Sequence, residues 1–467
     1  TTERLGITVK KIIIILLLFT FNTGVAKASE YKNTEDFSST NNVNEFNQWL
    51  YDNGHKQYLT IKENKKCKTA EKGSQTWYDN GCHKVQMSNN LKIKFYKNRW
   101  QIPYGTKPNR DTLIYYLWKT INHPYTNQFH LFEVKPSSNP YEFKSNLRAD
   151  DYLNKKIKES GILTYSLFEN DEIVIDEQSP DLGKFFDEKT KFRSNSMGKS
   201  MVGYLAGHAI CAGYIDSLDT RLNDWPLISK TLYHDQKLID LLNMSAGDQK
   251  FVTDQAMFNG QNNDDENLVV YMQLMEGSKK AKTIYNYHAL YTNIIFNYIK
   301  HKTGDEFEKF LEDVFQKHVK IKNSVIFFKH RKNPDSGKAN SMFYADRYDY
   351  LRIAKTIMDD YQSNNCVGKY LKEIYKRKVV KGGGFDKVDR APIYGRSSTY
   401  GGQFHFDYPG LKDRPIFGMA GFAGQVILID PETSKIVVLL SIHHPDNDKK
   451  SNKYFYDFNK IVLDKFK

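Results

Sequence analysis

The hydrophobic pattern of the chain contains two β-hairpins that enclose a mostly helical stretch. In residues 162–176, apolar positions alternate with polar ones on both sides of a polar turn. The same pattern recurs in residues 425–440. Strands near both ends of a helical middle predict an α+β domain. Its antiparallel sheet would be built from both chain ends, with flanking helices and a helical subdomain.

The N-terminal third has a different composition, rich in Asn, Lys, Tyr and Pro. Alternation in residues 91–96 and a turn signal at 103–105 predict short strands and loops. The composition changes near residues 137–140, before a predicted helix. We therefore expect an accessory region of unknown role in residues 29–145 and the main domain in residues 146–467.

The first residues have the charge order of an export signal. Lys10 and Lys11 precede an apolar run at 12–21, which is followed by the small-residue sequence at 26–28. The apolar run has ten residues, whereas a membrane-spanning helix needs about 20. We expect a signal peptide over residues 1–28, no stable membrane anchor, and a periplasmic or secreted protein.

The charge of the chain is basic but dispersed. Its net charge is +13, or about +10 without the signal peptide. The lysines alternate with Asp, Glu and Asn instead of forming one dense stripe. A dispersed charge predicts a solvated basic surface, and no nucleic-acid partner is expected. The hydrophobic fraction of 40% is sufficient for a large core.

The four cysteines fall into two groups. Cys67 and Cys82 lie fifteen residues apart in a polar stretch, which predicts a disulfide in an oxidising compartment. Cys211 lies in an apolar helical segment and is expected to be a buried free thiol. The pairing of Cys366 is left open. The sequence has no CxxC pair, which excludes a zinc ribbon or a CxxC redox motif.

A serine and a lysine lie three residues apart at the start of the apolar helix predicted over residues 196–215. This spacing places Ser196 and Lys199 on one helix face, within reach of each other. Burial lowers the pKa of a lysine, so that its neutral amine can take a serine proton. The same spacing at Ser29 lacks this context. A phosphate-binding loop is excluded because Arg193 occupies the position of its first glycine.

Three segments in order resemble the β-lactamase-related serine hydrolases, the superfamily of class C β-lactamases and penicillin-binding proteins. They are residues 196–200, 213–219 and 238–247. Within this superfamily the chain is most similar to the esterase and 6-aminohexanoate-dimer hydrolase branch, over roughly residues 150–445. The resemblance implies a serine β-lactamase/D,D-peptidase-like fold, a nucleophilic Ser196, a base at Lys199, and no metal or cofactor.

The resemblance also implies a tyrosine, in the loop before a helix, that relays the proton to the leaving group. Tyr285, Tyr287 and Tyr291 compete for this role. Counting back along the family pattern from the Thr-Gly pair at the end of the following helix selects Tyr287. His288 and Ala289 then occupy positions where many relatives carry Ser and Asn. We expect these two residues to contact the substrate.

The segment before the second hairpin resembles the third box of the family, an edge strand that flanks the scissile bond. Met419, Ala420 and Gly421 would lie along the substrate, and none of them is charged. The backbone N–H groups of Phe422 and Ser196 would form the oxyanion hole. An arginine from elsewhere, Arg396 or Arg414, would be needed to supply the cation that lactamases carry here.

Two other segments contain candidate residues. Residues 400–406 resemble the aromatic segment that leads into the third box, and either line the pocket or pack in the core. His443 and His444 are adjacent on a strand, so their side chains point to opposite faces and a shared metal ion is not expected.

These features together predict an exported serine hydrolase that cleaves a small-molecule amide or ester through an acyl-enzyme. One alternative is a D,D-peptidase or β-lactamase acting on cell-wall peptides or β-lactams. The other is a non-catalytic binding protein on the same fold. No oligomeric state is predicted.

Overall fold

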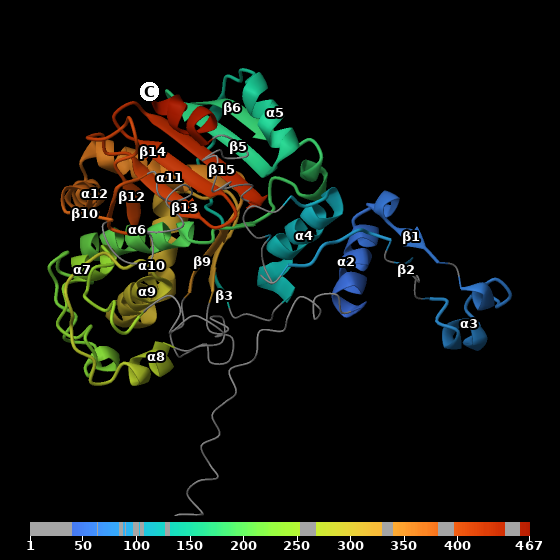
Figure 1. Ribbon diagram of the computed structural model, residues 1–467, viewed down its shortest axis with the longest axis horizontal. Helices are drawn as coiled ribbons and strands as arrows, with labels where there is room; N and C mark the ends of the chain where they lie inside the picture. The colour runs from blue at the N-terminus through green and yellow to red at the C-terminus, as the bar shows by residue number, and fades with distance from the viewer. Residues whose placement is uncertain are drawn as a thin grey trace, which may run out of the picture.

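The computed structural model (Figure 1) describes residues 40–62, 64–83, 87–88, 90–96, 102, 107–126, 131–252, 268–328, 340–381, 397–443 and 458–467. The predicted signal peptide, the predicted turn at 103–105, Arg396 and His444 lie outside these residues. Within the described part of the chain, every helix is too short or too polar to cross a membrane.

The main sheet joins the two predicted hairpins, as an α+β domain built from both chain ends requires. In the described residues its strands are, in spatial order, β10 (Val379–Val380), β11 (Thr399–Gly401), β12 (Phe404–Phe406), β13 (Phe417–Gly421), β14 (Gln425–Asp430), β15 (Lys435–His443), β5 (Gly161–Glu169), β6 (Glu172–Gln178) and β4 (Lys144–Ser145). All neighbours are antiparallel except β4 and β6. Strand β15 pairs with β5, for example Leu439 with Tyr165, and this pairing unites the chain ends. Both predicted hairpins are confirmed.

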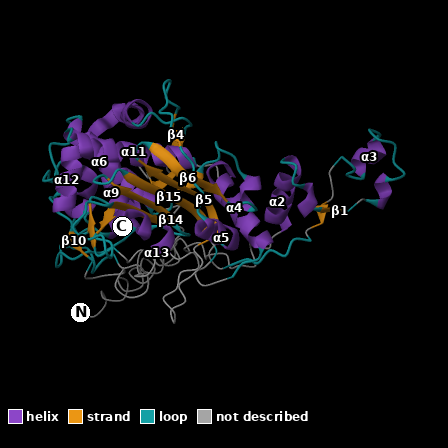
Figure 2. Ribbon diagram, turned by 90° about the horizontal axis from the view of Figure 1, so that it is seen from above, coloured by secondary structure: helices purple, strands orange, loops and turns teal. Residues whose placement is uncertain are grey.

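Helices cover both faces of this sheet (Figure 2). Alternation along the strands directs Ile427 and Ile429 into the larger core, and Leu428 into a smaller core on the other face. The larger core contains residues of α6 (Met197–Cys211), α7 (Leu238–Leu242), α8 (Leu268–Leu274), α9 (Ala289–Thr303), α10 (Phe307–Glu312), α11 (Arg347–Ser363) and α12 (Cys366–Lys376). The smaller core contains residues of α5 (Asp151–Glu159) and α13 (Phe458–Ile461).

A second, smaller sheet positions the start of α6. Its strands are, in spatial order, β3 (Leu131–Val134), β8 (Val325–Phe328), β9 (Asn340–Ala345) and β7 (Phe192–Arg193). Strand β7 ends just before Ser196 and pairs with β9. Short helical turns complete the described structure: η2 (Lys56–Tyr58), η3 (Lys65–Cys67), η4 (Leu182–Phe185), η5 (Pro226–Ile228), η6 (Gly304–Glu306), η7 (Asp313–His318) and η10 (Leu463–Phe466).

The N-terminal region is more helical than its sequence predicts. It contains α2 (Thr40–Asp52), α3 (Gln75–Asp79) and α4 (Arg110–Thr126), with only a two-residue ladder between β1 (Thr60–Ile61) and β2 (Met87–Ser88). The expectation of a strand at residues 91–96 was wrong. Backbone N–H groups of this segment donate to side chains of α4: those of Lys92 and Lys94 to Asp111 and Thr112, each at 2.9 Å. A helix therefore satisfies the backbone groups that a neighbouring strand would otherwise bind.

The predicted boundary near residue 145 does not separate two hydrophobic cores. Ile114, Tyr115 and Leu117 of α4 belong to the same core as α6. In addition, β3 and β4 are strands of the two sheets described above. Figure 1 shows that α3, at the far end of the N-terminal region, lies away from the main body.

Two disulfides are present. The predicted bond between Cys67 and Cys82 joins η3 to the residues after α3. The expectation that Cys211 is a free thiol was wrong, because Cys211 at the end of α6 is bonded to Cys366 at the start of α12. These two cysteines lie 155 residues apart in the sequence, so only the packing of the two helices brings them together.

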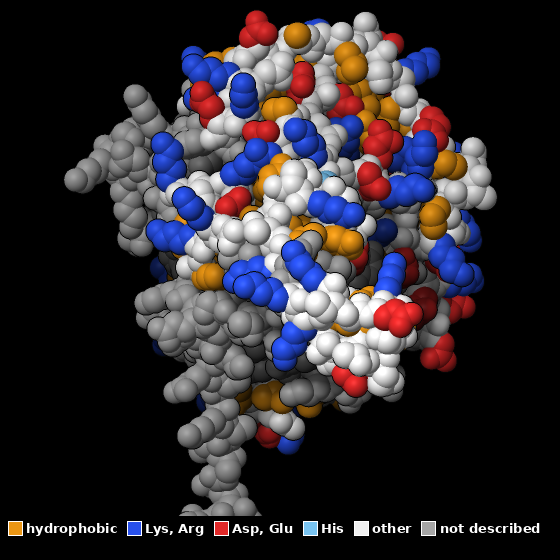
Figure 3. All heavy atoms as spheres, turned by 90° about the vertical axis from the view of Figure 1, so that its right-hand side faces the viewer, with side chains coloured by type: hydrophobic (Ala, Val, Ile, Leu, Met, Phe, Trp, Pro, Cys, Tyr) orange, Lys and Arg blue, Asp and Glu red, His pale blue; other side chains and the backbone are white. Residues whose placement is uncertain are grey.

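Basic side chains are distributed over the surface. On the face drawn in Figure 3, Lys and Arg side chains lie among Asp and Glu side chains. Elsewhere on the described surface, opposite charges form direct pairs, such as Lys302 with Asp224 at 2.6 Å and Arg221 with Asp235 at 3.1 Å. The basic excess of the chain is therefore partly offset at close range.

Candidate active site

The turn between β7 and α6 carries Ser196. Asn195 has a φ of 48°, in the left-handed region that few side chains adopt without support. The support comes from β9, because Phe343 exchanges hydrogen bonds with Ser194. The Ser194 N–H donates to the Phe343 carbonyl at 2.8 Å, and the Phe343 N–H donates to the Ser194 hydroxyl at 3.0 Å. Ser196 itself is partly exposed, so a ligand can reach it.

Lys199 lies one helical turn after Ser196, and the structure brings the two side chains together. The Nζ of Lys199 donates to the Oγ of Ser196 at 3.0 Å. Lys199 is only 6% exposed, although its neighbour Ser196 is accessible. A hydrogen bond of this length is short enough for proton transfer between a nucleophile and its base.

Tyr287 approaches the same pair from a different element. It lies in the loop before α9, and the centre of its ring is 5.0 Å from the Nζ of Lys199. The ring is half-buried and lies 5.9 Å from the ring of Tyr400, measured between centres. The three residues predicted to carry catalysis therefore converge, from the start of α6 and from the loop before α9.

The two competing tyrosines occupy other positions. The hydroxyl of Tyr291 donates to Oδ1 of Asp248 at 2.6 Å, and the side chain is fully buried. Tyr285 is also buried, with its ring 5.3 Å from that of Tyr400. Of the three candidates, Tyr287 is the one whose ring faces Lys199.

His288 does not lie where a substrate-binding role requires. Its Nε2 is 2.8 Å from Oδ2 of Asp248, and the residue is 6% exposed. Asn286 and Tyr233 donate to the same carboxylate at 2.9 and 2.6 Å. Burial alone would raise the pKa of Asp248, but His288 and the tyrosine hydroxyls hold it below its ordinary value. His288 thus belongs to a buried network beneath the tyrosine loop, while Ala289 begins α9 and is partly exposed.

The end of β13 is held directly against the nucleophile turn. The side-chain amide nitrogen of Asn195, Nδ2, donates to the backbone carbonyl of Phe422 at 2.6 Å. A Cβ on Gly421 would lie 2.4 Å from the carbonyl oxygen of Ser194, so only glycine fits this approach. The backbone of Phe422 is thereby kept close to Ser196, as an oxyanion hole made of their two N–H groups requires.

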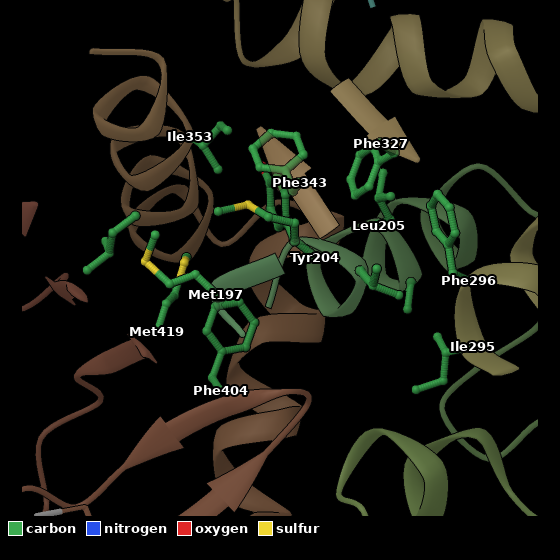
Figure 4. Close-up of a cluster of buried hydrophobic side chains, with 14 of the residues drawn as sticks. Met197, Tyr204, Leu205, Ile295, Phe296, Phe327, Phe343, Ile353, Phe404 and Met419 are labelled. Atoms are coloured by element: carbon green, nitrogen blue, oxygen red, sulfur yellow. The ribbon is translucent and has the colours of Figure 1, made fainter. Parts of the chain in front are cut away.

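Met419 is placed differently from our expectation. It is fully buried in the larger core, where Figure 4 shows it beside Met197 and Phe404. A substrate cannot contact a side chain in this position, so the substrate-binding role expected for Met419 was wrong. Ala420, whose side chain points to the other face of β13, is partly exposed.

Lys381, next to β10, is a cation near the site that the sequence did not indicate. Its Nζ donates to Nδ1 of His405 at 2.7 Å and to the hydroxyl of Ser397 at 2.6 Å. The His405 ring lies 6.3 Å from that of Tyr287. Burial and the charges of Lys381 and Lys199 lower the pKa of His405 well below its ordinary value, so the imidazole is neutral.

No local sequence signal identifies Lys381, because it becomes part of the site only through the pairing of β10, β11 and β12. Arg414 lies elsewhere. Its guanidinium forms an ion pair with Asp430 and donates to the carbonyl of Phe466 at 2.6 Å. Arg414 therefore does not supply charge to the site.

Gln403 holds the elements of the site in register. Its carbonyl accepts from the hydroxyl of Ser200 on α6 at 2.6 Å, and its side-chain oxygen accepts from Thr292 on α9 at 2.7 Å. Its backbone N–H donates to the carbonyl of Leu242 at 3.0 Å. One buried residue in the turn before β12 thus connects α6, α7 and α9. This connection fixes Lys199 relative to the tyrosine loop.

Neither a family model nor a curated protein matches the sequence. Solved structures do match. The chain has a β-lactamase-like α+β fold, as the sequence motifs predict. One similar structure, from Bacillus anthracis, is provisionally assigned as a 6-aminohexanoate-dimer hydrolase; identity is 15%, the TM-score is 0.56, and the match covers 77% of this chain and 97% of that one. Another, from Bacteroides dorei, is provisionally assigned as a β-lactamase; identity is 16%, the TM-score is 0.50, and coverage is 67% and 94%.

Proposed function

We propose that the protein is a serine hydrolase that cleaves a small-molecule amide or ester through an acyl-enzyme on Ser196. The observation that carries this proposal is the 3.0 Å hydrogen bond between Lys199 and Ser196, at the start of a buried helix and beneath the ring of Tyr287. Burial disfavours the charged form of a lysine side chain. A neutral Lys199 avoids this cost, and the neutral amine is the form that can accept the proton of Ser196.

In the proposed acylation, the neutral amine of Lys199 takes the proton of Ser196 as Oγ attacks the substrate carbonyl carbon. The carbonyl oxygen becomes an oxyanion and accepts hydrogen bonds from the N–H groups of Ser196 and Phe422. Each such donor contributes about 3 kcal/mol to transition-state stabilisation. Tyr287 then gives its hydroxyl proton to the leaving nitrogen or oxygen as the carbon–heteroatom bond breaks, and it receives in exchange the proton that Lys199 took from Ser196. In deacylation, water attacks the acyl carbon, the bond to Oγ of Ser196 breaks, and the carboxylic acid is released.

The local architecture supports this assignment of the oxyanion hole. The bond from Asn195 to Phe422 and the close approach of Gly421 to Ser194 preset the distance between the two N–H groups. The N-terminus of α6 adds a partial positive charge, which stabilises negative charge developing at Oγ. Preset donors of this kind need no rearrangement during the reaction.

We propose small, uncharged acyl groups as the preferred substrates. The third-box positions are uncharged, and a substrate carboxylate beside Ala420 would lose its water without a charged partner on that strand. We therefore expect p-nitrophenyl acetate or butyrate to be hydrolysed with a higher kcat/KM than nitrocefin. The similar Bacillus anthracis structure bears the name of an amide hydrolase, so short amides belong in the same panel.

One observation favours the alternative, a D,D-peptidase or β-lactamase. Lys381 offers a cation beside His405, one strand from the third box. If nitrocefin is the better substrate, the esterase or amidase proposal is wrong, and Lys381 is the first residue to replace. A drop in nitrocefin turnover in Lys381→Met, with ester turnover unchanged, would then assign the carboxylate contact.

A fluorophosphonate probe tests the proposed function. Wild-type protein should be labelled covalently, and the label should disappear in Ser196→Ala but remain in Ser229→Ala, an exposed serine outside the site. Absence of labelling in folded wild-type protein would favour a non-catalytic binding protein. Labelling that persists in Ser196→Ala would place the nucleophile elsewhere.

We also propose that the protein is exported to the periplasm or secreted. Besides the N-terminal signal pattern, the proposal is supported by the pairing of all four cysteines, because disulfides persist mainly in oxidising compartments. Fractionation of cells that express the full chain should find it outside the cytoplasm, without residues 1–28. A full-length cytoplasmic product would refute the proposal.

A further inference from the structure

A cluster of two histidines and one aspartate lies at the far end of α6 from the proposed active site. His208 is on α6, His318 ends η7, and Asp360 is on α11. The ligand atoms that these residues offer all lie within 4.8 Å of one another. Because a helix rises 1.5 Å per residue, His208 lies about 18 Å along α6 from Ser196. The cluster is therefore separate from the catalytic residues.

The carboxylate of Asp360 is buried and held in a fixed orientation. Tyr204 donates to Oδ2, Asn365 donates to Oδ1 at 2.7 Å, and Nε2 of His318 lies 2.9 Å from Oδ1. Burial alone would raise the pKa of Asp360, but these hydrogen bonds hold it below its ordinary value. An ionised, oriented carboxylate is the form that binds metal ions.

His208 contributes a buried nitrogen that the described residues do not satisfy. Its Nε2 has no hydrogen-bond partner among them. Its ring lies 5.0 Å from the ring of His318 and 4.6 Å from that of Tyr204, measured between centres. Burial and the neighbouring His318 lower the pKa of His208 to about 3, so the imidazole is neutral. Buried polar atoms are almost always satisfied, which points to a missing ligand here.

We propose that His208, His318 and Asp360 form a binding site for a divalent transition-metal ion, zinc in particular. Imidazole nitrogens and a carboxylate oxygen are zinc ligands, and three of them leave one position for water. Ligand atoms around a tetrahedral zinc lie about 3.4 Å apart, so the three groups need only draw together slightly. The side chain of His318, 37% exposed, has room to exchange its contact with Asp360 for the ion.

A cavity next to the cluster offers a path for the ion and its water. Its volume is about 300 Å³, and its lining includes His318 and Asp360. Three basic residues also line it. Two of them are paired, Lys355 with Asp359 at 2.6 Å and Arg352 with Asp349 at 2.8 Å, and the third, Lys320, is exposed to solvent. These pairs reduce the repulsion that an entering cation would meet.

The ion would join three elements that the chain brings together only by tertiary packing: α6, η7 and α11. The Cys211–Cys366 disulfide, three residues after His208, already joins α6 to α12. The proposed site is thus a second cross-link on the same end of α6. Its effect is expected on stability, because a ligand that binds only the folded chain raises the unfolding temperature. Catalysis at Ser196 would need no metal.

Zinc binding by the full-length, tag-free protein tests the proposal. After treatment with a chelator and its removal, titration calorimetry with zinc chloride should give one site with a Kd of about 1 µM or tighter. His208→Gln and His318→Gln should each weaken zinc binding at least ~10-fold. His234→Gln, a surface histidine outside the cluster, should bind zinc like the wild type.

Circular dichroism and thermal melting establish that each variant is folded, and His318 is exposed enough that its replacement should not disturb the core. Cobalt in place of zinc should give visible d–d absorption that is lost in both cluster variants. The proposal is overturned if the folded wild-type protein binds no zinc. It is also overturned if both cluster variants bind zinc as tightly as His234→Gln does. Neither outcome bears on the proposed hydrolase activity.

Discussion

The contact between Gly421 and Ser194 makes a quantitative prediction for the variant Gly421→Ala. The glycine does not have a positive φ, so its backbone conformation suits alanine as well. The added methyl group, however, would lie 2.4 Å from the carbonyl oxygen of Ser194. The methyl group would also lie 2.9 Å from Cβ of Gln425 on β14, so the variant tests how closely β13 is held against both the nucleophile turn and its partner strand.

The size of the effect follows from the distances. Real Cβ atoms essentially never approach another heavy atom closer than 3.0 Å, so the strand and the turn must separate by at least about 0.6 Å, from 2.4 to 3.0 Å. The Phe422 N–H moves with the strand and away from the oxyanion. Loss of one whole oxyanion donor costs about 10²–10³ in kcat. We expect a partial loss here, a decrease in kcat of roughly 10- to 100-fold with little change in KM.

Steady-state hydrolysis of p-nitrophenyl butyrate measures this effect, with thermal melting as a check on folding. Gly183→Ala is the matched control, because its methyl group would meet the flexible side chain of Gln178 at 2.5 Å, outside the site. The control should keep wild-type kcat. Wild-type kcat in Gly421→Ala, in a protein that melts normally, would refute the proposed oxyanion hole at Phe422.

Further predictions concern the other groups of the site and the buried histidines. Lys199→Met should lower kcat by about 10²–10⁴-fold without lowering the melting temperature, because a buried base is replaced by an apolar side chain of similar length; comparable activity in this variant would remove Lys199 as the base. Tyr287→Phe should slow ester hydrolysis strongly and Tyr291→Phe only weakly, and the reverse order in kcat would move the proton relay. The pKa of His208, lowered to about 3, means that below pH 6.5 the unfolded chain binds a proton that the native chain does not. Stability contributed by the neutral imidazole is therefore lost as the pH falls below about 6.5, by up to about 1.4 kcal/mol per pH unit. Thermal melting between pH 7 and pH 5 in the absence of metal should show a steeper decline for the wild type than for His208→Gln, and equal slopes would contradict this.

Features that depend on nearby residues were predictable from the sequence. The two hairpins follow from alternation over a few residues, and their turns contain residues such as Asn170 and Ser434 that adopt positive φ. The contact between Ser196 and Lys199 follows from the helical repeat alone. In each case the interacting groups are close in sequence, so that local periodicity determines which side chains meet.

Features that depend on distant residues were not predictable. His288 faces Asp248, forty residues earlier, and the order of motifs along the chain gives no sign of that contact. Met419 is buried because β13 turns its side chain toward α6, which alternation allows but does not require. Lys381 enters the site only because β10 lies two strands from β12. Each of these contacts is created by tertiary packing.

The acyl-enzyme itself is the most direct test of the central claim. The protein is mixed with p-nitrophenyl butyrate, quenched in acid during the first turnovers, digested and analysed by mass spectrometry. The account predicts one butyryl group on the peptide that contains Ser196, absent from the Ser196→Ala protein. Hydrolysis of the ester by wild-type protein with the acyl group on another residue, or with undiminished turnover in Ser196→Ala, would contradict the account.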